Sequence, residues 1–202
     1  SVLPLIGGIA SIFFPILPTT ECCVTLAILI FFGDMQISHI SHDPLTGLNN
    51  QASFDKIIER TAGYKPSGAK LYVFLADIDN FKSININYNR AEGDDTLVEV
   101  AETLKDLCAN TGSDLGRING DEFIIFRKFK TEDEALSFKY DIIKSVYEKN
   151  NTDNRGYKVS VSVGFHEVVT DTVDTIMDSI RLTGKLMFED KNTIRILDKK
   201  IE

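Results

Sequence analysis

Two carboxylates, Asp77 and Asp79, directly follow a dense apolar run at residues 71–76. Such a run, bounded by a glycine and by acids, predicts a buried strand, and ligands of open α/β sheets gather beyond the carboxyl ends of strands. Carboxylates with few cations nearby are costly unless a metal or a partner neutralises them. Hard oxygen ligands favour Mg²⁺ or Mn²⁺. The segment is therefore a candidate metal site, although a solvated acidic turn would have the same sequence.

A second acidic pair, Asp121 and Glu122, follows Asn119-Gly120 between two short apolar runs. An Asn-Gly pair in this position predicts a type I′ hairpin, with the two acids at the start of the returning strand and pointing to opposite faces. A hairpin tip can also carry charge simply because it is wet. If the hairpin pairs beside the 71–76 strand, Asp77 and Asp121 can reach one cation and leave Glu122 for another role. That layout suits metal ions that polarise a phosphoryl group.

A third group of polar residues comprises Lys82 and Asn85, followed by Gly93-Asp94. An amide and a carboxylate together can match the edge of guanine, with Asn85 at O6 or N7 and Asp94 at N1–H and N2–H. Lys82 and Lys191 are able to meet phosphate oxygens as point charges. The simpler alternatives are a helix N-cap for Asp94 and solvent-facing positions for both lysines.

The elements around these residues alternate between strands and helices, which indicates an α/β domain. Apolar periodicity and turn signals predict helices over 50–61, 95–107, 132–149 and 173–187. Strands are predicted over 71–76, 115–118, 122–126, 158–165 and 193–197.

The amino-acid composition limits the classes of function that this chain can have. The 202 residues include 22 basic and 30 acidic ones, for a net charge of −8. This balance argues against a protein that wraps a nucleic acid polymer, which needs a basic face. Three cysteines, two of them adjacent, make no disulfide framework and suit a reducing compartment.

The N-terminal stretch, residues 1–33, is almost uncharged and divides at Pro15 and Pro18 into apolar segments at 2–17 and 19–32. Three interpretations are open: two membrane helices joined by a proline turn, one longer interrupted or signal-anchor helix, or a buried hairpin of a soluble protein. We favour transmembrane helices that end a larger membrane sensor, followed by a linker at 34–42.

Taken in order, the motifs from Asp43 onward resemble the diguanylate cyclase (GGDEF) family. The matching segments are DPLTGLNN (43–50), ADIDNFKSIN (76–85), Gly93-Asp94, Arg117, NGDEF (119–123), VSVSVGF (159–165) and LMFEDK (186–191).

The resemblance implies a five-stranded mixed sheet flanked by helices over residues 43–202, like that of nucleotide cyclases and polymerase palms. It also implies a reaction, in which two GTP condense to cyclic di-GMP with release of two pyrophosphates. The active unit would be a homodimer with one GTP per subunit. We expect the domain in the cytoplasm, at the inner membrane of a bacterium.

The resemblance further implies roles for single residues. Asp77, the Ile78 carbonyl and Asp121 would bind Mg²⁺ or Mn²⁺. Glu122 would be the catalytic base, and Lys82 would stabilise developing phosphoryl charge. The residues expected to bind substrate are Phe81, Asn85, Asp94 and Lys191, with Asn85 and Asp94 at the guanine and Lys191 at phosphate.

Several positions depart from the family pattern. Asn119 replaces the first glycine of the signature, and Asn89-Arg90 replaces a Gly-His pair. Because the metal carboxylates are all present, we favour an active, slow cyclase over a degenerate module that binds GTP or a protein partner. Asn110 and Ser113 stand where a product-inhibition RxxD site needs Arg and Asp, so we expect no such site.

Overall fold

The computed structural model describes residues 2, 19–38, 41–65, 67–150 and 155–201. The chain divides into two compact units, Ser1–Ser41 and His42–Glu202. The second unit contains every residue for which the sequence predicts a chemical role.

In the first unit, helix α2 spans Thr19–Ser38 and carries Glu21 in its first turn. It begins at Thr19, the first residue of the apolar segment at 19–32. It then continues through Gly33, so part of the expected linker is helical. The apolar segment at 3–17 lies outside the described residues.

The expected membrane location is wrong. Across the described ranges, no helix combines the length and the apolar content needed to cross a bilayer. Helix α2 has 20 residues, but Glu21 and Asp34 leave an uncharged run only at 22–33, whereas a spanning helix needs about 20 apolar residues.

The second unit is built on one antiparallel sheet. Its strands are β1 (Lys70–Ile78), β2 (Asp114–Asn119), β3 (Glu122–Phe129) and β4 (Val161–Glu167), in the order β2-β3-β1-β4. All three pairings are antiparallel. The described residues therefore form four antiparallel strands, whereas a five-stranded mixed sheet was expected.

The missing fifth strand is part of a helix. Residues 193–197 continue helix α7, which spans Val173–Ile201. No glycine or proline follows Gly184 to stop the helix, and local strand propensity is too weak to end it alone.

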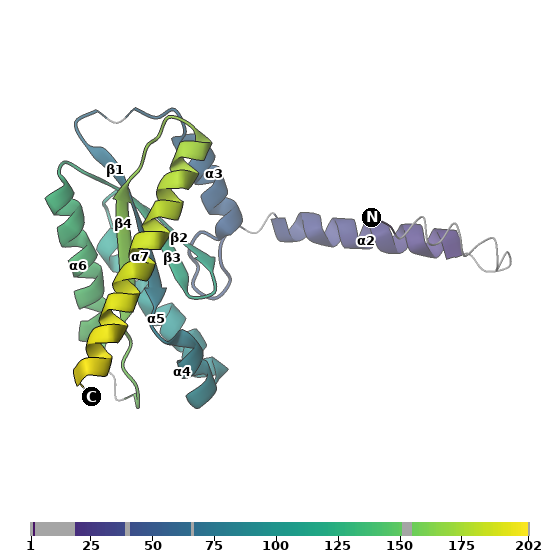
Figure 1. Ribbon diagram of the computed structural model, residues 1–202. Coiled ribbons are helices and arrows are strands. Elements are labelled where there is room, and N and C mark those ends of the chain that lie inside the picture. The colour runs from purple at the N-terminus through teal and green to yellow at the C-terminus, as the bar shows by residue number, and fades with distance from the viewer. Residues whose placement is uncertain (1, 3–18, 39–40, 66, 151–154, 202) are drawn as a thin grey trace. The chain divides into compact units, whose positions relative to one another are not determined.

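Helices cover both faces of the sheet (Figure 1). Helices α5 (Arg90–Cys108) and α6 (Glu132–Lys149) pack on one face, where Phe74, Ile78 and Phe123 are fully buried. Helices α3 (Gln51–Thr61) and α7 pack on the other, against Val73 and Phe126. Because β1 lies between β3 and β4 with helices above and below, both of its faces are buried, as its unbroken apolar run predicts.

The short helix α4 (Phe81–Asn87) was not predicted. Asn80, at a left-handed φ of 55°, turns the chain directly from the end of β1 into this helix. Helix α5 then begins at Arg90, with Asn89 as its N-cap: the Asn89 side chain accepts a hydrogen bond from the Glu92 N–H at 3.0 Å. Asp94 lies inside α5, so the N-cap interpretation of Asp94 is wrong.

Candidate active site

The carboxylates of two separate motifs meet at the end of β1. Asp77 lies directly opposite Glu122 of β3, and on its other side opposite Ser162 of β4. Side chains of directly opposed antiparallel residues point to the same face, so the acids of Asp77 and Glu122 share one side of the sheet. The 119–122 hairpin thus pairs beside the 71–76 strand, as the metal hypothesis requires.

The hairpin turn lies one residue later than Asn119-Gly120. Asn119 pairs with Glu122, so the loop residues are Gly120, at φ 42°, and Asp121. A register irregularity between Arg117 and Asn119 causes this shift, because a bulge adds one residue to its strand. Asp121 therefore lies in the loop rather than on the strand, and its carbonyl accepts a hydrogen bond from the Ile78 N–H at 3.4 Å.

The end of β1 carries a high density of negative charge. Burial, and then the negative charge of Asp77, raises the pKa of the Asp121 carboxyl above its ordinary value. Lys191 of α7 compensates part of the charge through an ion pair with Asp77, and its Nζ lies 3.9 Å from Asp79 Oδ1. Arg117 also acts on Asp121 but is paired with Asp43, so among the described residues negative charge remains in excess at Asp77, Asp79, Asp121 and Glu122.

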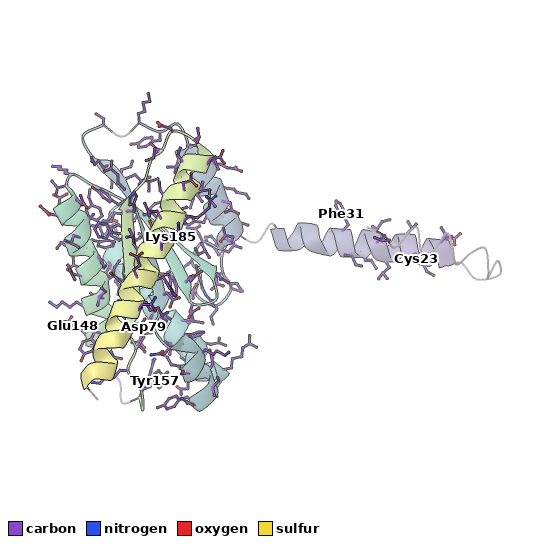
Figure 2. The ribbon with its side chains drawn as sticks, in the orientation of Figure 1. Cys23, Phe31, Asp79, Glu148, Tyr157 and Lys185 are labelled. Carbon is purple, nitrogen blue, oxygen red and sulfur yellow. The ribbon has the colours of Figure 1, made fainter. Side chains whose placement is uncertain are left out.

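Asp79 has partners that the sequence did not reveal. Its carboxylate accepts hydrogen bonds from the hydroxyls of Ser160, at 2.8 Å, and Ser162, at 2.7 Å. Its N–H donates to the Ser160 carbonyl at 2.9 Å. Asp79 is thereby fixed to β4, beside α7 (Figure 2). The only sequence signal was the pair of serines alternating with valines at 159–163.

These groups suit a hard divalent cation. The available donors are two carboxylates, Asp77 and Asp121, with the main-chain carbonyl of Ile78 next to them. Among the described residues, no group of three or more His, Cys, Asp or Glu side chains is arranged as a complete metal cage. Mg²⁺ rarely uses such a cage: it binds through one or two carboxylates and completes its octahedron with water and substrate phosphates. The donor set therefore fits Mg²⁺ or Mn²⁺.

A cavity of about 340 Å³ adjoins the acidic hairpin, because Arg117 in its wall donates a hydrogen bond to the Gly120 carbonyl. The residues that line it are Phe81, Asn85, Arg90, Asp94, Leu97 and Arg117. It brings together three of the four predicted substrate-binding residues, and its volume is within the usual range for small-molecule sites. Gly93 leaves room for the Asn85 side-chain amide, because a Cβ at position 93 would come within 2.1 Å of Asn85 Oδ1.

Arg117 forms one wall of the cavity and is held there by two contacts within the protein. Its Nε donates to the Gly120 carbonyl at 2.7 Å, and its Nη1 pairs with Asp43 Oδ1 at 3.0 Å. Burial alone would raise the pKa of the Asp43 carboxyl, but hydrogen bonds from Thr46 and the Arg117 guanidinium lower it. Asp43 and Arg117, both from matched motifs, thus tie the start of the domain to the hairpin.

Three further residues with predicted roles, Lys82, Lys191 and Glu122, are not among those that line the cavity. Lys82 lies exposed on α4 and does not line the cavity. Lys191 contacts the carboxylates, since it pairs with Asp77. Glu122 is half-buried, and its Oε2 accepts a hydrogen bond from Asn119 Nδ2 at 3.4 Å. Sequence reasoning missed Arg90 as a lining residue, because α5 was expected to begin five residues later.

Comparison with known proteins places this chain in one family. The family described as "Diguanylate cyclase, GGDEF domain" matches residues 40–195. An uncharacterised 19.3 kDa protein of Streptomyces ambofaciens is 28% identical over 162 residues, which are 79% of this chain and 83% of that protein. Diguanylate cyclase DgcM of Escherichia coli is 34% identical over 134 residues, 65% of this chain.

The matched region is 32% of the length of DgcM, so this chain spans about a third of that relative. Among solved structures, the GGDEF domain of DgcB from Caulobacter crescentus, crystallised in complex with c-di-GMP, superposes with a TM-score of 0.66. It is 22% identical, and the match covers 76% of this chain and 91% of that one. The antiparallel sheet, the acidic end of β1 and the family match agree, and the chain belongs to the GGDEF diguanylate cyclase family.

Proposed function

We propose that this chain is a diguanylate cyclase that joins two GTP into cyclic di-GMP and releases two pyrophosphates. Synthesis of cyclic di-GMP is the activity of the family. The observation that carries the proposal for this chain is the direct pairing of Asp77 with Glu122, beside a cavity lined by Phe81, Asn85 and Asp94. Carboxylates for a metal and groups for a guanine base thus lie next to each other.

The acidic end of β1 would hold the triphosphate. Asp77, Asp121 and the Ile78 carbonyl are the groups available to bind Mg²⁺ or Mn²⁺, which supplies positive charge against the charge developing on the phosphoryl group. Glu122, on the same face as Asp77, accepts the proton of the attacking 3′-hydroxyl. Lys191, already between Asp77 and Asp79, and the exposed Lys82 supply donors for phosphate oxygens.

The cavity would hold the base. Asp94 accepts the N1–H and N2–H of guanine, Asn85 lines the cavity next to it, and Phe81 and Leu97 supply apolar surface. Fixing the nucleotide in this way is a large part of catalysis in phosphoryl transfer, where positioning and charge do most of the work.

The reaction requires two copies of the chain. One copy of the domain offers one such cavity and one acidic strand end among its described residues. The product, in contrast, contains two guanosines related by a two-fold axis. A C2 homodimer that brings two sites face to face satisfies this symmetry.

The test is turnover of GTP by the full chain with Mg²⁺, monitored by separation of the nucleotide products. We expect cyclic di-GMP from the wild type and a loss of at least about a hundredfold in Glu122→Gln, the usual size of a general-base contribution. Glu59→Gln, an exposed change on α3, is the matched control and should turn over normally. Binding of GTP without product in wild type and both variants would refute the cyclase.

One observation favours a second candidate, a catalytically degenerate domain that binds GTP or a protein partner. Asn119 stands where the family signature begins with glycine, and its amide contacts the Glu122 carboxylate at 3.4 Å. A side chain here restrains the candidate base and takes up space near the triphosphate. The same assay separates the two, because the degenerate domain would bind GTP and leave it intact.

A further inference from the structure

Arg90 lines the same cavity as Asn85 and Asp94, although it belongs to none of the matched motifs. It is the first residue of α5, and its place there is fixed locally. Asn89, at φ 151°, caps the helix through its hydrogen bond with the Glu92 N–H. The backbone that carries the Arg90 side chain is therefore held in a defined position at the wall of the cavity.

The two arginines of the cavity differ in their partners. Arg117 is engaged by Asp43 and by the Gly120 carbonyl. Arg90 is exposed, and within the described part of the chain no hydrogen bond or ion pair engages its guanidinium. Asp94 is half-buried and has no ion pair with Arg90. Within the residues that the structure describes, a cation and a carboxylate without partners thus line one cavity.

Their spacing suits a flat ligand with donors on one edge and acceptors on the next. Arg90 and Asp94 are i and i+4 on α5, so their Cβ atoms lie about 5–6 Å apart on one helix face. Guanine has N1–H and N2–H as donors, and O6 and N7 as acceptors on the adjoining edge. Asn85 is poorly placed to serve those acceptors, because its Nδ2 points at the Phe81 carbonyl, 3.4 Å away.

We propose that Arg90 donates to O6 and N7 of the bound guanine while Asp94 accepts from its N1–H and N2–H, so that Arg90 sets the preference for GTP over ATP. The inference rests on the proposed function, since it takes GTP as the ligand. A bidentate Arg–guanine contact is the commonest specific one to this base. Adenine carries an N6 amino donor in place of the O6 acceptor. Because the guanidinium offers only donors, it cannot form a hydrogen bond with this group.

The experiment measures binding without turnover. The full chain with Mg²⁺ is titrated with 3′-deoxy-GTP, which lacks the attacking hydroxyl, with 3′-deoxy-7-deaza-GTP, which also lacks N7, and with 3′-deoxy-ATP. The variants are Arg90→Ala and Arg90→Lys, which keeps the charge but not the planar fork. Arg181→Ala, on the exposed surface of α7, is the control.

We expect wild type and Arg181→Ala to bind the 7-deaza analogue about tenfold more weakly than 3′-deoxy-GTP. Arg90→Ala and Arg90→Lys should bind 3′-deoxy-GTP at least as weakly as wild type binds the analogue, because they lose the contact to O6 as well. They should also lose sensitivity to N7 and discriminate less against 3′-deoxy-ATP. Sensitivity to N7 that persists in Arg90→Ala, or equal weakening of all three nucleotides, overturns the inference. A wild type that binds GTP but ignores N7 defeats this inference alone, whereas one that binds no nucleotide defeats the proposed function as well.

Discussion

Lys191, near the end of helix α7, forms an ion pair with Asp77, 114 residues earlier at the end of β1. Both side chains are only 17% exposed, so neither charge is well solvated. Gly164 makes the contact possible, because a Cβ there would come within 2.4 Å of the Thr183 carbonyl and push α7 away from β4. Lys191 thus neutralises a carboxylate that is a candidate metal ligand.

Replacing this lysine should destabilise the protein in a way that Mg²⁺ repairs. Lys191→Met leaves Asp77 half-buried without its cation, so we expect the free energy of unfolding in EDTA to fall by about 1–3 kcal/mol. Mg²⁺ should restore more stability to the variant than it adds to the wild type, since the ion then meets no competing ammonium. Urea unfolding with and without Mg²⁺ measures both effects.

The control is Lys185→Met, an exposed position one to two turns earlier on α7 and labelled in Figure 2. Its stability should change by less than about 0.5 kcal/mol, with the response to Mg²⁺ of the wild type. Equal Mg²⁺ responses in Lys191→Met and wild type would show that the ion does not bind at Asp77.

Gly93→Ala should weaken nucleotide binding without unfolding the domain. The new methyl group would lie 2.1 Å from Asn85 Oδ1, so the amide must leave its place in the cavity. We expect affinity for 3′-deoxy-GTP to fall about tenfold, because the displaced amide takes up room that the base needs. Gly184→Ala is a matched helical change whose Cβ meets its nearest neighbour, Leu75, at an ordinary 3.7 Å. It should leave affinity unchanged, and a loss there would indicate a general effect of glycine replacement.

Asp43 should make the domain sensitive to acid. Its pKa is lowered in the folded state, so the folded protein holds fewer protons than the unfolded chain around the ordinary value of 3.8. The stability that Asp43 contributes is therefore complete above that value and is lost as the pH falls through the folded pKa. Asp43→Asn should unfold more easily at pH 6, with a shallower decline below pH 4. Asp141→Asn, exposed on α6, should follow the wild type in urea titrations at both pH values.

Much of the site was predictable because its parts are local. The buried strand before Asp77 and the hairpin that returns at Glu122 follow from apolar runs and turn chemistry. Their adjacency was a condition of the metal hypothesis, and the pairing of Asp77 with Glu122 meets it. What was missed depends on long-range packing or on one-residue shifts. The serines that hold Asp79 lie 81 and 83 residues away, and the bulge before Asn119 moves the loop by one position. The predicted strand at 193–197 failed because α7 has no breaker to end it.

The contact between Asn119 and Glu122 gives a prediction for activity. Asn119 Nδ2 donates to Glu122 Oε2 at 3.4 Å, which restrains the orientation of the candidate base. Asn119→Gly removes this restraint and restores the family residue, so we expect turnover of GTP to rise roughly threefold to tenfold, as expected for one weak hydrogen bond. Stability should fall by about 0.5–1 kcal/mol, the usual cost of glycine in a strand. Asn110→Gly is the matched control, since Asn110 already has a φ of 58° and glycine fits there without loss. Turnover that stays level or falls in Asn119→Gly would mean that the amide orients Glu122 for catalysis rather than restraining it.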